Sequence, residues 1–332
     1  MKKLVFPGAF FLCLACIQAA VVPSAQRGPA LQKLHESYAK SADLHSDIVY
    51  KKIGEWDVTL DLMLPRRTKN KYGEPLFKDG APVVFYLHGG GWINGNRYTS
   101  AQAVEFFSER GIASVGVSYR FSKDGDTLET CVTDCFDAVR FIAKNAEKYN
   151  LDPNRFLAYG ASAGGHLTLM MLTAEAKDFP GDPTLADAAF KFIGGVAMCP
   201  PTTLVDAEAW NGEDYINVGR LEKLLNCSGE PMWALAKKLS PLHLLKKDSP
   251  RILIVHGEDD KTVSIEGSIL MVKKAEQIGA DVQLVRAPGA GHNFKGKHPP
   301  LWRVQRLIFL ENLWEMARSS YGQNTWENAP QL

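Results

Sequence analysis

A five-residue turn, GASAG at 160–164, separates a short apolar run at 156–159 from a second apolar segment at 167–172. A serine between small residues, after a strand and before a helix, is the arrangement that exposes a hydroxyl on a tight turn. Glycines flank such a serine because a Cβ at either place collides with neighbouring backbone. The hydroxyl then lies at the positive end of the helix, where negative charge is favoured. Ser162 is therefore the first candidate nucleophile.

The rest of the chain alternates short apolar runs with helical patterns. Helices are expected over 128–148, 264–278 and 300–317. Strands are expected over 47–53, 57–64, 83–87, 112–117, 156–159, 192–198, 252–255 and 282–285. This alternation predicts an α/β fold with a mostly parallel eight-stranded sheet and helices on both faces. Residues 200–250 break the rhythm and are interpreted as an insertion over one edge of the sheet, a lid or pocket wall.

A second motif, HGGGW at 88–92, directly follows the strand expected at 83–87. Consecutive glycines leave backbone N–H groups unshielded, and such donors stabilise the oxyanion formed during attack on an ester. We expect Gly90 and Gly91 to supply two donors and Ala163, the residue after the serine, a third. A flexible surface turn is the alternative. His88 is expected to brace this loop rather than to transfer protons.

Two further motifs follow strands in the second half of the chain. The sequence HGEDDKTV at 256–263 offers three carboxylates at the end of a strand, where the sites of open α/β sheets gather. The sequence GAGHNF at 289–294 places His292 on a glycine-rich loop, and a neutral imidazole there can take a proton from the serine. The order serine, acid, histidine is that of an α/β-hydrolase triad.

Together, HGGGW, GASAGG, HGEDDKTV and GHNF resemble the α/β-hydrolase esterases with an HGGG oxyanion loop. These include hormone-sensitive-lipase-like carboxylesterases and bacterial acetyl-xylan or feruloyl esterase-like proteins. The resemblance covers about residues 46–318. In that family the acid lies in an H-G-x-x-D-x-x-V pattern, which favours Asp260 over Asp259 and Glu258. The position of the insertion, after the strand at 192–198, is closer to the polysaccharide-esterase branch.

The resemblance implies a catalytic triad of Ser162, Asp260 and His292, with oxyanion donors at Gly90, Gly91 and Ala163. It implies neither a cofactor nor a metal, and the chain has no cysteine–histidine spacing typical of structural zinc.

The N-terminus has the pattern of a secretory signal peptide over residues 1–20. Lys2 and Lys3 precede an apolar run at 4–17, which small residues follow. The run is too short for a comfortable permanent membrane span. We therefore expect export to the periplasm or the extracellular space. Lipid attachment at Cys16 is a weaker alternative, since the usual aliphatic residue three positions upstream is missing.

Four cysteines lie outside this segment, at 131, 135, 199 and 227. An exported protein could oxidise them, and four cysteines allow three pairings between which sequence alone does not choose. Cys131 and Cys135 share a helix face and can instead be small buried residues. Residues 319–332 are expected to form a loose polar tail after the hydrolase domain.

The composition excludes some partners. The formal net charge of +1 gives no field to hold nucleic acid.

The function expected is an exported serine esterase that acts on a small or polysaccharide ester, with no stable membrane insertion; the oligomeric state is left open. Two alternatives are a dipeptidyl-peptidase-type serine peptidase, for whose propeller the segment 46–82 has no room, and a non-catalytic binding protein of the same fold. Trp92, Trp210 and Trp233 either line a sugar-facing pocket or pack in the core and lid.

Overall fold

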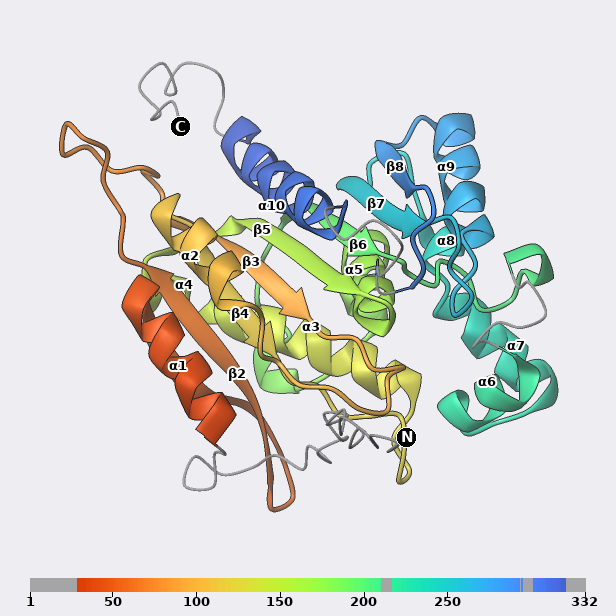
Figure 1. The fold of residues 1–332 in the computed structure, drawn as a ribbon. Helices are drawn as coiled ribbons and strands as arrows, with labels where there is room; N and C mark the ends of the chain where they lie inside the picture. Colours follow the sequence, from red (N-terminus) through yellow and green to blue (C-terminus); the bar gives the residue numbers. More distant parts are fainter. Residues whose placement is uncertain (1–28, 210–216, 293, 295–300, 321–332) are drawn as a thin grey trace, which may run out of the picture.

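The computed structural model describes residues 29–209, 217–292, 294 and 301–320. Its centre is one sheet of eight strands (Figure 1): β1 (Ala42–Ile53), β2 (Trp56–Pro65), β3 (Ala81–Leu87), β4 (Ala113–Val117), β5 (Leu151–Ala161), β6 (Phe192–Met198), β7 (Arg251–Gly257) and β8 (Val282–Ala287). The strand order is β1-β2-β4-β3-β5-β6-β7-β8. The pairs β1–β2 and β2–β4 are antiparallel, and all others are parallel. The predicted fold is confirmed.

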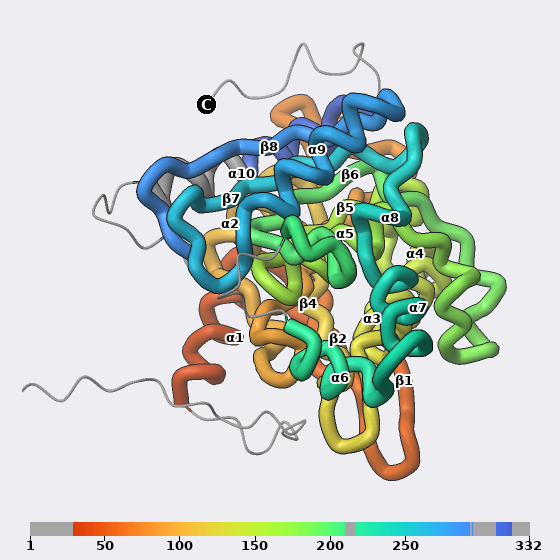
Figure 2. Tube along the Cα trace, turned by 90° about the vertical axis from the view of Figure 1, so that its right-hand side faces the viewer, coloured from red at the N-terminus to blue at the C-terminus, as the bar shows by residue number. Residues whose placement is uncertain are grey.

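Helices cover both faces of this sheet (Figures 1 and 2). One face carries α1 (Pro29–Ser41), α2 (Ala101–Glu109) and α10 (Leu301–Ser319). The other carries α3 (Leu128–Lys144), α4 (Ala146–Tyr149), α5 (Ala163–Thr173) and α9 (Glu266–Ile278). Along β3, Val83 and Phe85 pack in the core shared with α3 and α5, and Val84 packs in the core shared with α2 and α10. A central strand buried on both faces explains why its sequence is a continuous apolar run.

The helix ends follow local sequence signals. Thr127 and Thr130 form a capping box at the start of α3. Gly279 adopts a left-handed conformation, with φ of +74°, and ends α9 as predicted. Every residue of α5 is buried, which agrees with its apolar composition on all sides.

The folded domain begins earlier than the predicted residue 46. Strand β1 starts at Ala42, and α1 precedes it. This helix packs on the sheet through few side chains, of which His35 and Tyr38 are buried. Helix α2 was also not predicted. Helix α1 buries His35 and Tyr38, which carry polar groups, and α2 spans nine residues, so neither stands out as a long apolar pattern in the sequence.

The insertion at 200–250 holds three α-helices in its described part: α6 (Val218–Leu225), α7 (Gly229–Lys238) and α8 (Pro241–Leu244). As predicted, no strand occurs among residues 200–209 and 217–250. The helices lie at the end of the sheet to which β5 points (Figure 1), with α6 beside α3 and α8 beside α5. The insertion therefore lies where it can border a site at the carboxyl ends of the strands.

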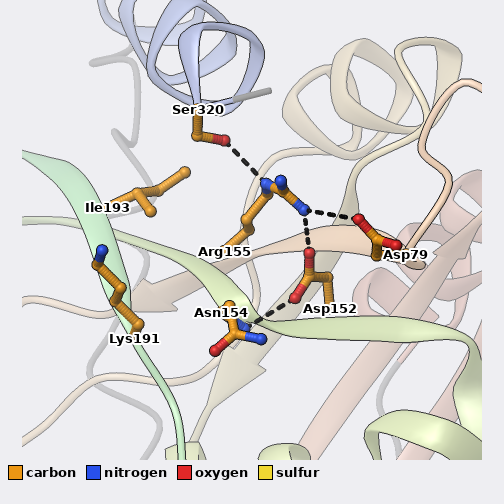
Figure 3. Close-up of a pocket in the computed structure, with 7 residues that line it drawn as sticks. All are labelled: Asp79, Asp152, Asn154, Arg155, Lys191, Ile193 and Ser320. Atoms are coloured by element: carbon orange, nitrogen blue, oxygen red, sulfur yellow. Dashed lines mark hydrogen bonds and ion pairs between the residues drawn. The ribbon is translucent and has the colours of Figure 1, made fainter. Parts of the chain in front are cut away.

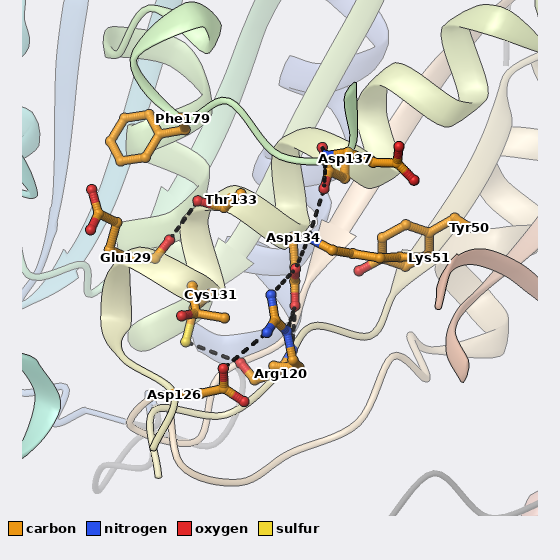
Figure 4. Close-up of polar contacts among 12 residues, drawn as sticks. Tyr50, Lys51, Arg120, Asp126, Glu129, Cys131, Thr133, Asp134, Asp137 and Phe179 are labelled. Carbon is orange, nitrogen blue, oxygen red and sulfur yellow. Dashed lines mark hydrogen bonds and ion pairs between the residues drawn. The ribbon is translucent and has the colours of Figure 1, made fainter. Parts of the chain in front are cut away.

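A buried charge network joins β1 to α3 (Figure 4). The Nζ of Lys51 lies 2.7 Å from a carboxylate oxygen of Asp134 and 2.7 Å from one of Asp137, and both carboxylates are fully buried. Arg120 pairs with Asp134 at 2.8 Å, and Arg140 pairs with Asp137 at 2.9 Å. Buried carboxylates are tolerated because each one has a cation beside it.

Several sequence predictions fall outside the described residues: the signal peptide at 1–20 with Cys16, Trp210, and all but the first two positions of the tail at 319–332. Within the described part of the chain, no helix combines the length and the apolar character needed to cross a bilayer.

Candidate active site

Ser162 lies at the bend between β5 and α5, with φ of +56° and ψ of −123°. Such a conformation is strained for a residue with a side chain and costs on the order of 1–3 kcal/mol. Its N–H donates to the carbonyl of Met198, 2.8 Å away. A Cβ at Gly160 would lie 2.4 Å from the oxygen of Leu87, and one at Gly164 would lie 2.0 Å from it. The flanking glycines are thus required by the close approach of β3, as the sequence predicted.

His88 braces the loop that follows β3. It is buried, its ring stacks on Tyr119, and its Nδ1 donates to the carbonyl of Gly89 at 2.8 Å. The Tyr119 hydroxyl donates to the carbonyl of His88 at 2.7 Å. Burial lowers the pKa of His88 to about 4, so the ring is neutral near pH 7. These contacts agree with the predicted structural role.

Gly90 and Gly91 both have positive φ, +119° and +59°. A Cβ at Gly90 would lie 2.1 Å from the carbonyl oxygen of Asn94, so only glycine fits there. No described residue accepts a hydrogen bond from the N–H of Gly90, Gly91 or Ala163. Ala163 is the first residue of α5, where a backbone N–H has no partner within the helix. All three predicted donors are thus available to a ligand oxygen.

The structure brings the three predicted triad residues together. The Nε2 of His292 lies 2.9 Å from Oγ of Ser162, and its Nδ1 lies 2.7 Å from Oδ2 of Asp260. The carboxylate only accepts, so Nδ1 carries the proton and Nε2 is left to accept from the serine hydroxyl. The loops are fixed to one another, because Asp259 N–H donates to the carbonyl of Ala290 at 3.0 Å. This geometry lets His292 take the Ser162 proton.

The surroundings of Asp260 differ from those of the neighbouring carboxylates Glu258 and Asp259. Burial opposes ionisation, but hydrogen bonds from His256, His292 and Val263 N–H outweigh it, so the pKa of Asp260 lies well below its usual value. Glu258 instead pairs with Arg286 at 2.7 Å, and Asp259 is exposed. Of the three carboxylates that the sequence left in competition, Asp260 alone reaches His292.

The insertion contacts the site from outside the sheet. Arg220 of α6 donates to the carbonyl of Gly91 at 3.1 Å. His166 accepts from Trp92 Nε1 at 3.3 Å and donates from Nε2 to the carbonyl of Leu239 at 2.8 Å. Trp92 is buried, which rules out its proposed place on a sugar-facing wall. Trp233 is partly buried against the main core.

Cys199 lies behind the histidine loop and was not predicted to be near the site. Its thiol donates to the carbonyl of His292 at 3.1 Å, and burial raises the thiol pKa. The thiol sulfur, a carboxylate oxygen of Asp260 and a ring nitrogen of His292 all lie within 4.8 Å of one another, a spacing that could hold a metal ion. A cation there would displace the Nδ1 proton that the triad needs. The four described cysteines are all unpaired, which answers the pairing left open by the sequence.

A polar cavity lies at the amino ends of β5 and β6, the end of the sheet opposite Ser162 (Figure 3), and is lined by Asp79, Asp152, Asn154, Arg155, Lys191, Ile193 and Ser320. Arg155 contacts Asp152, approaches Asp79 at 3.7 Å and donates to Ser320 at 3.1 Å. The guanidinium is therefore neutralised within the chain, and the cavity joins the end of α10 to the start of β5.

Comparison with known proteins identifies the family of this chain. The BD-FAE family model matches residues 60–275. The probable isoprenylcysteine alpha-carbonyl methylesterase ICME of Oryza sativa subsp. japonica is 30% identical over 245 residues, 70% of this chain and 54% of that protein. Esterase LipC of Mycobacterium tuberculosis is 24% identical over 222 residues, 64% of this chain and 53% of that protein. The chain thus spans about half the length of these relatives.

Solved structures show the same fold. A truncated carbohydrate esterase from gut microbiota superposes with a TM-score of 0.66 at 21% identity, covering 84% of this chain and 98% of that one. The Thermogutta terrifontis esterase Est2 superposes with a TM-score of 0.66 at 24% identity, covering 85% and 95%. The BD-FAE match extends over about two thirds of the 332 residues. The chain therefore belongs to the BD-FAE family and has the α/β-hydrolase fold.

Proposed function

We propose that this chain is a serine esterase that hydrolyses carboxylic esters through Ser162, His292 and Asp260. The observation that carries the proposal is the continuous hydrogen-bond chain from Ser162 Oγ to His292 Nε2, 2.9 Å, and from His292 Nδ1 to Asp260 Oδ2, 2.7 Å. Such a relay activates a hydroxyl that is otherwise a weak nucleophile near neutral pH.

The reaction has two halves. Ser162 Oγ attacks the ester carbonyl while its proton moves to His292, and the oxyanion accepts from the N–H groups of Gly90, Gly91 and Ala163. His292 then gives the proton to the leaving alcohol, and an acyl ester remains on Ser162. Water loses a proton to His292 and attacks this ester, which releases the acid and restores the hydroxyl. Asp260 stays ionised and stabilises the imidazolium in both halves.

The substrate class proposed is a short acyl ester on a carbohydrate, such as an acetyl or feruloyl ester of plant polysaccharide. Support comes from the motif resemblance and from the likeness to a gut-microbial carbohydrate esterase. The similar Thermogutta terrifontis esterase has been solved with propionate and with butyrate, which agrees with short acyl groups.

The test compares Ser162→Ala with Ser228→Ala, a matched change at an exposed serine whose side chain does not cap its helix. With p-nitrophenyl acetate, we expect the first to lose on the order of 10⁶ in kcat and the second to match the wild type. Equal turnover by wild type and Ser162→Ala ends the proposal. Acetylated xylan, methyl ferulate and p-nitrophenyl esters of graded length then define the acyl group, and proline dipeptide amides test the peptidase alternative.

We also propose that the chain is exported, on the pattern of residues 1–20. Expression in a Gram-negative host with and without residues 1–20 tests this. Esterase activity should reach the periplasm only with the segment present; equal retention of both forms inside the cell contradicts it.

A further inference from the structure

The triad carboxylate is contacted by two imidazoles. His292 approaches Oδ2 of Asp260 from the catalytic loop at 2.7 Å, and His256 approaches the same oxygen at 3.3 Å from the end of β7. The His256 side chain has no exposed surface. A buried imidazole that contacts the triad carboxylate is either a packing residue or a residue that holds this carboxylate in position.

The hydrogen bonds of His256 fix its tautomer. Its Nε2 faces two acceptors, the Val263 carbonyl at 3.0 Å and the Asp260 carboxylate, so Nε2 must carry a proton. Its Nδ1 lies 2.8 Å from Oγ of Ser268, a fully buried residue of α9. With its proton at Nε2, the ring accepts from the Ser268 hydroxyl at Nδ1 and directs the Nε2–H toward the Val263 carbonyl and Asp260.

The contact completes the coordination of the carboxylate. Oδ1 accepts from the N–H of Thr262 at 2.9 Å and of Val263 at 3.0 Å, and Oδ2 accepts from His292 at 2.7 Å. The Nε2–H of His256, shared with the Val263 carbonyl, lies at the remaining lone-pair position of Oδ2 at 3.3 Å. Without His256, His292 would be the one histidine at Oδ2, and the position of Oδ2 would depend on a ring that changes its protonation state during the reaction.

We propose that His256 is a positioning residue of the esterase site, which holds Oδ2 of Asp260 toward His292, and that Ser268 fixes the His256 tautomer needed for this. The inference rests on the proposed function, since it assigns the role for that reaction. The groups facing Asp260 are His256 from β7, His292 from its loop and the Cys199 thiol from the end of β6. His256 is thus the donor to Oδ2 that takes no part in proton transfer.

The experiment compares His256→Gln, whose amide nitrogen reaches about the place of Nε2, with His256→Phe, which keeps a ring but has no donor. His243→Phe is the matched control, because His243 also forms a histidine–carboxylate pair, but outside the triad. Its Nε2 lies 2.8 Å from Oδ2 of Asp206. For His256→Phe we expect kcat to fall up to about 100-fold with KM within twofold, since misplacement of a catalytic group carries such a cost. His256→Gln should keep most of kcat, and His243→Phe all of it. For Ser268→Ala we expect a kcat between that of His256→Gln and that of His256→Phe.

A second readout does not depend on turnover. The low-field proton resonance of the His292 Nδ1–H, which reports its bond to Asp260, should be retained in His256→Gln and shifted or broadened in His256→Phe. An unmoved resonance and an unchanged kcat in His256→Phe overturn the positioning role. Equal losses in both His256 variants, matched by equal falls in melting temperature, also overturn it in favour of packing. Inactive wild-type protein with a normal resonance would instead count against the esterase function.

Discussion

Trp92 Nε1 donates a hydrogen bond to Nδ1 of His166 across 3.3 Å, so the loop with the proposed oxyanion donors is bonded to the helix that begins after the serine. The other ring nitrogen of His166 donates to Leu239 at the end of α7. One buried imidazole thereby links three segments: the glycine loop, the nucleophile helix and the insertion. The relative position of these segments decides whether the oxyanion donors face the carbonyl under attack.

Replacing the indole tests this link. Trp92→Phe removes the donor and leaves His166 Nδ1 unsatisfied, which should cost about 1–3 kcal/mol of unfolding free energy. Because the glycine loop loses its attachment, we expect kcat for p-nitrophenyl acetate to fall about tenfold with little change in KM. Trp56→Phe, on a tryptophan that is 67% exposed, is the control and should change neither quantity. An unaltered kcat in Trp92→Phe contradicts the link.

Acid should destabilise the fold through two buried histidines. Burial lowers the pKa of His88 and of His166 from 6.5 to about 4. The unfolded chain therefore binds these protons first as the pH falls. Stability is fully present above about pH 6.5 and is lost as the pH falls toward 4, on the order of 3 kcal/mol for each histidine.

Urea unfolding at pH 7 and pH 4.5 measures this loss. His166→Gln should be less stable than the wild type at pH 7 but lose less stability between the two pH values. A wild-type stability that stays constant over this range would be inconsistent with neutral buried rings.

Gly164→Ala should disrupt the site through backbone contact. The added Cβ would lie 2.0 Å from the Leu87 oxygen and 2.7 Å from the His88 oxygen, and backbone cannot yield as a flexible side chain can. We expect loss of soluble folded protein or a fall in kcat on the order of 10² from displaced oxyanion donors. Gly219→Ala in α6 meets nothing closer than 3.8 Å and should be neutral or stabilising by up to about 1 kcal/mol. Wild-type kcat in Gly164→Ala would show that the loops can separate without consequence.

The charge network at α3 offers a paired test of buried against exposed ion pairs. Lys51→Met leaves Asp134 and Asp137 fully buried with one cation fewer, which should cost on the order of 3 kcal/mol. The neighbouring Lys52 pairs with Asp57 at 3.4 Å with both side chains largely exposed, so Lys52→Met should change stability by less than about 1 kcal/mol. Chemical denaturation of both variants decides; similar values for the two would mean that burial of this network has little energetic weight.

The sequence located Ser162 and His292 because each lies in a short glycine-rich turn directly after a strand, where local pattern and geometry coincide. Asp260 required more, since three consecutive carboxylates share one turn and only the family spacing separated them. His256 and Ser268 could not be paired from sequence, because their contact depends on how α9 packs against β7. For the same reason Cys199 was missed: a left-handed residue after β6 brings its thiol to a loop 93 positions away.

The described cysteines carry a practical consequence for how the protein is made. Cys131, Cys135, Cys199 and Cys227 are all present as thiols. With no cystine closing any loop among them, maturation of the hydrolase domain does not call for an oxidising foldase. Recombinant material raised in a reducing cytosol, or kept in dithiothreitol, should therefore have the same native architecture as material raised in an oxidising compartment.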